Sequence, residues 1–480
     1  MIGVLIDLEK EIFKTMFREY DVRGRVSDDE LNIDTVKLIT KGFITFLTRR
    51  NVNRVVLGYD NRDYSESFST AALEEFIKSG FEVYDLGMTI SPVAYFAQYY
   101  YKAPGVMMIT ASHNPNGWSG FKLGDSYSKT MVPDEITELY DIILGEEFSE
   151  DNIKIGVHNK VSPRDAYIDY VISNITMSDY KPRLVIDAGN GGAGLYAYEV
   201  FQRLGCITFQ LNCDPDSSYP HYFPNPSDLK ARERLAQMVR NRDISAAVGL
   251  SFDGDGDRLG VIDQNGQNIW SDRVLLLLAR QLLERKKGAK IVFDVKCTQA
   301  LVEDIETHSG QPIMWKTGHS YIKSKMHEEK AELAGERSGH IFIGGDEFYS
   351  FDDAILAGAK LVEYLSKVNR PIADILMEAP QYITSPEIKV HCSDTLKYGL
   401  VESIVKEFKD EYGDKVIDIN GARVMFDDGW GLIRASSNLP ELVLIFEAKT
   451  WKQLLKIRQI FKEKLTRFPM ASDEWINDIE

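Results

Sequence analysis

The stretch VMMITASHNPNG spans residues 106–117 and joins an apolar run to a polar loop. Val106–Ile109 is typical of a short buried strand, and the residues after it are small, polar and turn-forming. The hydroxyl of Ser112, at the end of this strand with His113 beside it and Lys122 downstream, is well placed for covalent chemistry. The alternative is an ordinary surface turn, because Ser, Asn, Pro and Gly are common in turns.

Strand-like and helix-like segments alternate on both sides of this stretch. Strand-like runs at Arg54–Leu57, Glu82–Leu86 and Gly105–Ile109 are separated by helical stretches, and the same alternation returns twice further along. This pattern predicts three similar α/β domains with mixed sheets. After about residue 381, strand-like runs follow one another closely and lead to a helix-like stretch, which predicts a C-terminal α+β domain. We expect domain boundaries that give residues 1–163, 164–264, 265–381 and 382–480.

Composition limits the classes of function. The 480 residues exceed what one hydrophobic core usually serves, and 44% apolar with 27% charged residues is typical of a globular protein. A net charge of −17 argues against a nucleic-acid partner. No apolar run is long enough for a membrane helix, and the N-terminus does not resemble a secretory signal. The four cysteines are scattered, without the spacing of a zinc site or a disulfide framework. We therefore expect a cytoplasmic enzyme, in which a local cluster of Arg and Lys could still bind a phosphorylated ligand.

A second motif, DGDGDR at residues 253–258, follows a strand-like run. On an extended segment alternate residues point the same way, so Asp253, Asp255 and Asp257 should converge while the glycines let the backbone curl. Three such carboxylates repel one another unless a cation lies among them, and oxygen ligands favour Mg²⁺ over Ca²⁺ or Mn²⁺. An EF-hand is excluded by Arg258 at its sixth position. The alternative is a solvated acidic turn.

Two later motifs are weaker when each is taken alone. GERSGH at 335–340 places Glu336 and Ser338 at alternate positions between glycines, which suits recognition of sugar hydroxyls, but for this motif alone a hairpin turn is the better explanation. RASSN at 434–438 offers a guanidinium, two hydroxyls and an amide that could bind a phosphate, or it could be a simple turn.

A competing interpretation comes from GNGGAG at 189–194, which fits G-x-G-x-x-G after a strand-like run, with Asp214 following the next one. That context is the one required for a dinucleotide-binding site, and it favours an NAD-dependent oxidoreductase. This interpretation leaves the serine loop and the acidic loop unexplained.

Taken together, the four loops in this order resemble the α-D-phosphohexomutase superfamily, most closely the bacterial phosphomannomutase/phosphoglucomutase type. The resemblance covers nearly the whole chain and includes four further motifs. These are REYDVRG at 18–24, TISP at 89–92, FDVKC at 293–297 and WKTGHS at 315–320. The resemblance implies that the four domains surround a central cleft.

The resemblance also implies roles for individual residues. Ser112 would carry a phosphoryl group, and one Mg²⁺ would be held by Asp253, Asp255, Asp257 and a phosphate oxygen on Ser112. The implied catalytic residues are Ser112, Lys122 as an acid/base candidate, His319, Arg258 and Arg23. The implied substrate-binding residues are Tyr20, Lys296, Glu336, Ser338, Arg434, Ser436, Ser437 and Asn438.

The implied reaction is reversible phosphoryl transfer between C1 and C6 of a hexose phosphate through phosphoserine and a hexose 1,6-bisphosphate. The chain departs from the family pattern at Leu439, a position commonly Thr, and at Arg337, where close relatives often carry Met. The R-P-S-G-T-like run of phosphoglucosamine mutases is absent, so mannose and glucose phosphates rank above glucosamine phosphate. A non-catalytic sugar-phosphate-binding protein is a further alternative. We expect small sugar phosphates as partners, no nucleic acid or membrane, and a monomer or weak dimer.

Overall fold

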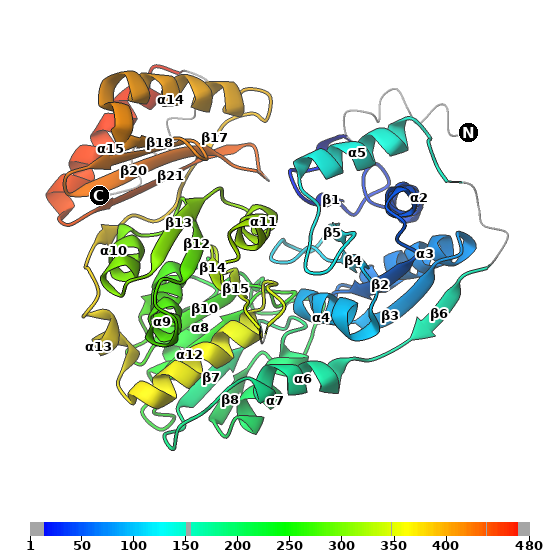
Figure 1. Cartoon of the computed structure of the whole chain (residues 1–480), viewed down its shortest axis with the longest axis horizontal. Helices are drawn as coiled ribbons and strands as arrows, with labels where there is room; N and C mark the ends of the chain where they lie inside the picture. Colours follow the sequence, from blue (N-terminus) through cyan, green and yellow to red (C-terminus); the bar gives the residue numbers. More distant parts are fainter. Residues whose placement is uncertain (1–13, 150–154, 347, 438, 469–480) are drawn as a thin grey trace.

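The computed structural model describes residues 14–149, 155–346, 348–437 and 439–468, whose strands form four sheets in chain order (Figure 1). The blue N-terminal elements and the orange and red C-terminal elements lie on opposite sides of the view, with the green and yellow elements below and between them. No helix among the described residues is long and apolar enough to cross a membrane.

The first sheet has six strands in the order β1-β5-β4-β2-β3-β6, with β3, β2 and β4 parallel and β5 antiparallel to β4. Val55 and Leu57 of β2 face a core different from that of Val56, so both faces of this sheet are covered. The strands are β1 (Val22–Arg25), β2 (Arg54–Tyr59), β3 (Glu82–Met88), β4 (Gly105–Ile109), β5 (Trp118–Gly124) and β6 (Val157–Lys160). The helices are α2 (Ile33–Arg49), α3 (Ser65–Lys78), α4 (Ser91–Tyr101) and α5 (Pro133–Leu144).

The second and third sheets repeat this plan, with parallel strands and an antiparallel strand at one side. The second contains β7 (Arg183–Asp187), β8 (Ile207–Leu211), β9 (Val248–Phe252), β10 (Leu259–Asp263) and β11 (Asn268–Ile269), with α6 (Arg164–Ser173), α7 (Gly194–Arg203) and α8 (Glu233–Val239). The third contains β12 (Lys290–Asp294), β13 (Gln311–Trp315), β14 (Leu333–Gly335) and β15 (Ile341–Ile343), with α9 (Ser271–Arg285), α10 (Gln299–Thr307), α11 (His319–Glu329), α12 (Ala354–Val368) and α13 (Ile372–Leu376).

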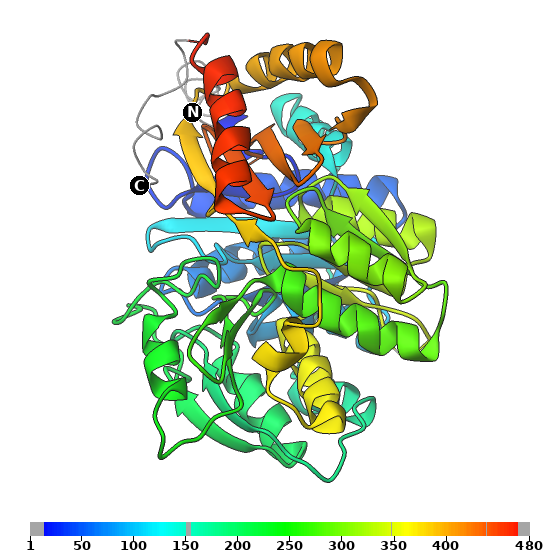
Figure 2. The same ribbon diagram turned by 90° about the vertical axis from the view of Figure 1, so that its left-hand side faces the viewer.

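The fourth sheet is antiparallel, and α14 and α15 share its main core (Figure 2). Its elements are β16 (Ile383–Thr384), β17 (Ile388–His391), α14 (Lys397–Tyr412), the 3₁₀ turn Gly413–Lys415, β18 (Val416–Ile417), β19 (Ala422–Phe426), β20 (Gly429–Ala435), β21 (Glu441–Ala448) and α15 (Trp451–Leu465). Trp430 and Leu432 of this sheet pack with Val295 of the third unit in a separate cluster.

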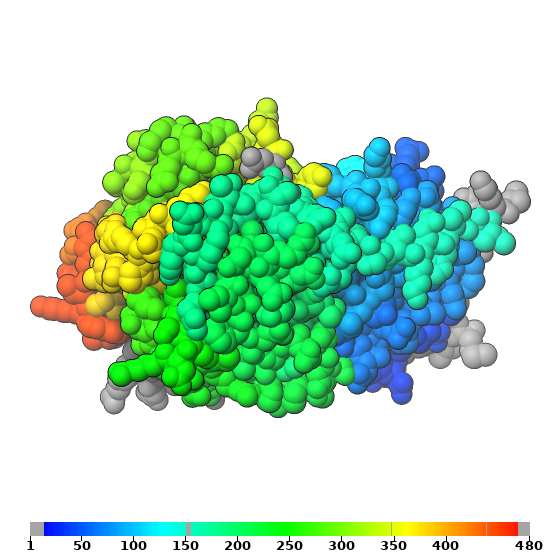
Figure 3. All heavy atoms as spheres, turned by 90° about the horizontal axis from the view of Figure 1, so that it is seen from below, coloured from blue at the N-terminus to red at the C-terminus, as the bar shows by residue number. Residues whose placement is uncertain are grey.

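The apolar clusters show which of the four units are packed together. Tyr95 of α4, Phe201 of α7 and Leu277 of α9 belong to a single apolar cluster that runs through the first three units. In the space-filling view the green second unit lies against the blue first unit and the yellow helix of the third (Figure 3). The fourth unit has its own core and a smaller apolar contact with the third. It is therefore the part of the protein best able to move as a whole.

The predicted fold class, three similar α/β units with mixed sheets and a C-terminal α+β unit, is confirmed. In each of the first three units the key loop occupies the same place, between the parallel strand β4, β9 or β14 and the antiparallel strand β5, β10 or β15. The fourth loop likewise connects neighbouring strands, β20 and β21. Equivalent loops of neighbouring units thus supply the side chains of one site.

Candidate active site

The Ser112 backbone has φ +51°, the left-handed region that residues other than glycine adopt uncommonly. Arg62 holds this conformation in place. Its guanidinium donates hydrogen bonds to the carbonyl oxygens of Ser112 (3.0 Å), Asn114 (2.6 Å) and Pro115 (3.0 Å). An unusual backbone conformation fixed from outside the loop is common at functional sites, because packing elsewhere offsets its strain. Arg62 was not among the residues expected from the sequence.

The Ser112 hydroxyl points at the acidic loop. Its Oγ donates to Asp253 Oδ2 at 2.8 Å and lies 3.1 Å from Nδ1 of His113. Burial, together with Arg258 and Arg23 nearby, holds the pKa of His113 well below its usual value. The serine therefore lies between a carboxylate and a neutral imidazole.

The three aspartates of the second loop converge as predicted, with ligand oxygens within 4.8 Å of one another. The reason given from the sequence was wrong, because residues 253–257 form a turn rather than an extended segment. Gly256 has φ +73°, and Asp253 Oδ1 accepts the backbone N–H groups of Asp257 (3.0 Å) and Arg258 (3.1 Å). The turn, rather than strand alternation, brings the carboxylates together.

The glycine run at 189–194 supports this turn from behind. The N–H of Gly192 donates to the carbonyl of Gly254 at 3.1 Å, and a Cβ on Gly191 would lie 2.9 Å from the Gly254 Cα. The glycines allow two backbones to approach closely, which is the same property that a dinucleotide site would use for a pyrophosphate. The packing here gives these residues a structural task and offers no support for the NAD interpretation.

Lys122 places its ammonium among the carboxylates. Its Nζ donates to Asp255 Oδ2 at 2.6 Å, to Asp257 and to Ser91 Oγ at 3.1 Å. Although burial opposes it, the charges of Asp255 and Asp257 raise the pKa of Lys122 well above its usual value. Burial, and then Asp257 and Asp255, raise the pKa of Asp253 well above its ordinary range. The lysine thus offsets part of the negative charge of this cluster.

The donor set fits a hard divalent cation. Oδ1 of Asp255 and Oδ1 of Asp257 are buried and have no hydrogen-bond partner. Three buried carboxylates with unused oxygens are the ligands that Mg²⁺ prefers. The cluster could therefore hold one metal ion.

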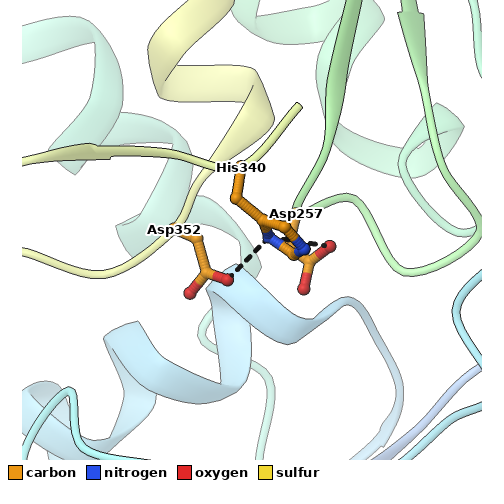
Figure 4. Close-up of side chains that lie close together, drawn as sticks. All are labelled: Asp257, His340 and Asp352. Carbon is orange, nitrogen blue, oxygen red and sulfur yellow. Dashed lines mark ion pairs between the residues drawn. The ribbon is translucent and has the colours of Figure 1, made fainter. Parts of the chain in front are cut away.

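A second group of titratable side chains shares Asp257 with the first and adds His340 and Asp352 (Figure 4). His340 Nδ1 is 3.0 Å from Asp352 Oδ2 and 3.6 Å from Asp257 Oδ1, while its Nε2 accepts a hydrogen bond from Arg258 Nε at 2.9 Å. Because Nε2 accepts this hydrogen bond, Nδ1 is the ring nitrogen that faces the carboxylates. This arrangement favours proton handling over metal binding. His340 ends the GERSGH motif, but Asp352 carries no signal in the sequence.

A cleft of about 620 Å³ lies next to this cluster and brings together most of the predicted site residues. Its lining includes the following residues expected from the sequence: Tyr20, Arg23, Arg258, Lys296, His319, Glu336, Ser338, Arg434, Ser436 and Ser437. Ser112, Lys122 and the three aspartates are not part of this lining, but their cluster connects to it through His113, Arg258 and His340. Asn438 lies outside the described residues.

The GERSGH loop, residues 335–340, belongs to the third unit. Glu336 accepts the hydroxyl of Ser338 at 3.3 Å and the backbone N–H of Gly318, and burial raises the pKa of Glu336. The ring of His319 meets Tyr20 edge-on with centroids 4.9 Å apart. Burial lowers the pKa of His319 well below its usual value, so a neutral imidazole faces the cleft.

Two cations line the side of the cleft nearest the fourth unit. Arg434 donates to Asn420 Oδ1 at 2.8 Å and to Ser437 Oγ at 3.1 Å. Lys296 donates to Glu387 Oε1 at 2.9 Å. Arg434 is paired with neutral groups, which leaves its charge available to an anion.

Family models match the chain in four consecutive parts. They are described as phosphoglucomutase/phosphomannomutase alpha/beta/alpha domain I at residues 14–150, domain II at 165–266, domain III at 270–382 and the C-terminal domain at 387–464.

Individual proteins show the same relationship. A phosphomannomutase/phosphoglucomutase of Pseudomonas syringae pv. tomato is 36% identical over 457 residues, covering 94% of this chain and 95% of that protein. A phosphoglucomutase of Neisseria meningitidis is 36% identical over 466 residues, covering 95% and 98%. The crystal structure of a phosphoglucomutase/phosphomannomutase family protein from Burkholderia thailandensis superposes with a TM-score of 0.88 at 33% identity, covering 96% of this chain and 99% of that one. The chain belongs to the phosphoglucomutase/phosphomannomutase family.

Proposed function

We propose that the protein moves a phosphoryl group reversibly between C1 and C6 of a hexose phosphate, mannose or glucose, through phosphoserine at Ser112 and a hexose 1,6-bisphosphate. One observation carries the proposal most directly. The Ser112 hydroxyl is 2.8 Å from Asp253 within a buried carboxylate cluster, beside a cleft whose far side carries Arg434. A residue that could carry a phosphoryl group and a residue that could bind a second phosphate thus belong to one site.

In the first transfer the bond from phosphorus to Ser112 Oγ breaks as a bond to the free sugar hydroxyl forms. The hydroxyl gives up its proton, and the neutral ring of His319 is a suitable acceptor because it lines the cleft. The cations Arg23 and Arg258 also line the cleft and favour the charge on the transferring group. Lys122 is proposed as a further acid/base residue. In the metal-free cluster its ammonium donates a hydrogen bond to Asp255.

A Mg²⁺ held by Asp253, Asp255, Asp257 and a phosphate oxygen on Ser112 would neutralise negative charge at the phosphoryl group. The oxygen-only donors support this choice of metal, as do the Oδ1 atoms of Asp255 and Asp257, which accept no hydrogen bond. Added hexose 1,6-bisphosphate would act as an activator, since it can load Ser112.

In the second half of the reaction the bisphosphate turns over, so that its other phosphoryl group faces Ser112 and returns to it. Arg434, Ser436 and Ser437, with Asn438, would hold the distal phosphate in both orientations. Tyr20, Lys296, Glu336 and Ser338 would bind the sugar. The separate core of the fourth unit supports a cleft that closes for chemistry and loosens for turnover.

The second candidate function is that of a phosphoglucosamine mutase, which differs in the sugar of the substrate. A coupled assay with mannose, glucose and glucosamine 1-phosphates, together with intact-mass analysis, tests the whole proposal. We expect one phosphate on Ser112 and turnover that is fastest with mannose or glucose. Turnover fastest with glucosamine 1-phosphate would move the assignment to that sugar. A phosphate-free chain without turnover, even after addition of the bisphosphate, would favour the non-catalytic alternative. The cytoplasmic location and the monomeric or weakly dimeric state stay predictions.

A further inference from the structure

Three units of the fold meet at one carboxylate beside the cleft. Glu19 directly precedes the cleft residue Tyr20. Its Oε2 accepts a hydrogen bond from Tyr321 at 3.2 Å, and its Oε1 accepts one from Tyr398 at 2.7 Å. Tyr321 lies in the first turn of α11 in the third unit, and Tyr398 lies in the first turn of α14 in the fourth. One side chain of the first unit thus connects to both others.

The start of α14 also contacts the loop that follows Arg434. Lys397, which precedes Tyr398, is buried and donates to the carbonyl of Leu439 at 3.0 Å and to Asp394 at 2.6 Å. Arg18 of the first unit lies 3.8 Å from the same Asp394. A force that draws the start of α14 toward the first unit therefore also moves the loop after Arg434.

The two phenols are suited to hold this contact at neutral pH. Burial and the charge of Glu19 raise the pKa of Tyr321 and of Tyr398, so both remain hydrogen-bond donors. Hydrogen bonds to a charged acceptor are stronger than those between neutral groups. Tyr398 is 45% exposed, which reduces the strength of its bond and keeps the contact reversible.

We propose that Glu19, Tyr321 and Tyr398 form a latch between the first, third and fourth units that retains the bisphosphate while it turns over. This inference rests on the proposed function, because retention matters only for an intermediate that must stay bound between two transfers. When the latch opens, the fourth unit can move away from the first, and the ligand leaves. While it holds, the fourth unit stays attached to the first as the rest of the cleft loosens, so the sugar can turn without leaving and give its second phosphoryl group to Ser112.

The test measures escape of the intermediate. Phosphorylated protein is mixed with limiting glucose 1-phosphate or mannose 1-phosphate, and free hexose 1,6-bisphosphate is separated from protein and quantified during the first turnovers. We expect Tyr398→Phe and Tyr321→Phe to release about three- to tenfold more bisphosphate per turnover than the unchanged protein. Tyr412→Phe, the same substitution in the last turn of α14, is the matched control and should release no more than the unchanged protein.

A second variant guards against a purely structural effect. Glu19→Met keeps about the size of the side chain but has no acceptor oxygen, and combined with Tyr398→Phe it should leak no more than Glu19→Met alone, since both remove the same bond. Additive leakage, or leakage of the phenylalanine variants equal to that of Tyr412→Phe, would overturn the latch. If the phosphorylated, unchanged protein formed no bisphosphate at all, the proposed function would be wrong, and the latch with it.

Discussion

The side of the site around Ser112 and the side around Arg434 are built differently. Ser112 is fixed by Arg62 and by Asp253, which follows a strand of a different sheet, and the first three units share one apolar core. Arg434 belongs to a unit with its own core, and its hydrogen bonds go to Asn420 and Ser437 within that unit. In the proposed mechanism phosphorus–oxygen bonds break on the Ser112 side, and rigid packing suits it because small displacements are costly there. The proposal requires the Arg434 side only to hold a phosphate, and its separate core allows it to move.

The largest effect is expected at the rigid side. Ser112→Ala removes the atom that would carry the phosphoryl group, so mutase activity should fall about 1000-fold or more. A coupled assay measures the loss, and intact mass should show that the phosphate on the chain has disappeared. Activity near that of the unchanged protein would show that this side is not the reacting one.

The next largest effect concerns the charge balance of the same side. Asp255→Asn removes one carboxylate from a buried set of three and should lower the rate at a fixed Mg²⁺ concentration by about 100-fold. A Mg²⁺ titration of activity should shift to higher concentrations. Asp243→Asn, an exposed aspartate of the same unit, serves as the control. An unchanged titration would contradict the metal site.

At the mobile side the effect should fall on binding rather than on chemistry. Arg434→Ala removes a charged donor for the distal phosphate and should raise KM about 10- to 100-fold, with a smaller change in kcat. Arg467→Ala, on an exposed arginine of the same unit, should leave both constants unchanged. If instead kcat fell and KM stayed constant, Arg434 would act in the transfer step and the contrast between the two sides would be lost.

The smallest effect concerns the stability of the rigid side. Asp187 lies two residues before the glycine run behind the acidic loop, and burial raises its pKa to about 6. A carboxyl group whose folded pKa exceeds its unfolded value of 3.8 stabilises the fold while protonated, and this contribution is lost as pH rises from about 4 through about 6.

In the unchanged protein the urea midpoint should therefore fall between pH 4 and pH 6.5, by an amount that corresponds to on the order of 2–3 kcal/mol of unfolding free energy. In Asp187→Asn this fall should be smaller. The Tyr222 hydroxyl, which donates to Asp187, can still donate to the amide oxygen. A variant whose urea midpoint has the same pH dependence as that of the unchanged protein would show that Asp187 does not titrate in this range.

Some parts of the fold and the site could be predicted because their signals are local. The apolar run before Ser112 and the run before Asp253 are continuous in sequence, and both are strands that end at the expected loops. Elsewhere a local signal was cut short, since β18 covers only Val416–Ile417 of the strand-like run that starts there. The chain turns at 419–420 and then reaches Gly421, whose φ is +87°. Turn residues next to a short apolar run limited the strand there.

Other parts of the site had no local signal. Arg62 acts on a loop 50 residues away, Asp352 meets His340 from an isolated β-bridge, and Glu19 and Tyr398 are 379 positions apart. Each of these residues belongs to a common type in an ordinary local context. Only the packing of different units gives each of them its partner.

The sequence by itself determined which residue types carry the chemistry, because a hydroxyl and three carboxylates follow short strands, and a guanidinium lies near the end of another, each in a recognisable motif. It also determined the sequence of α/β units, since hydrophobic periodicity is a local property. The tertiary structure decided how those motifs meet. It alone showed that Lys122 enters the carboxylate cluster, that a glycine run supports the acidic loop, and that Glu19 connects three units. The physical reason is that these contacts depend on how separate units pack together, which no short segment of the chain encodes.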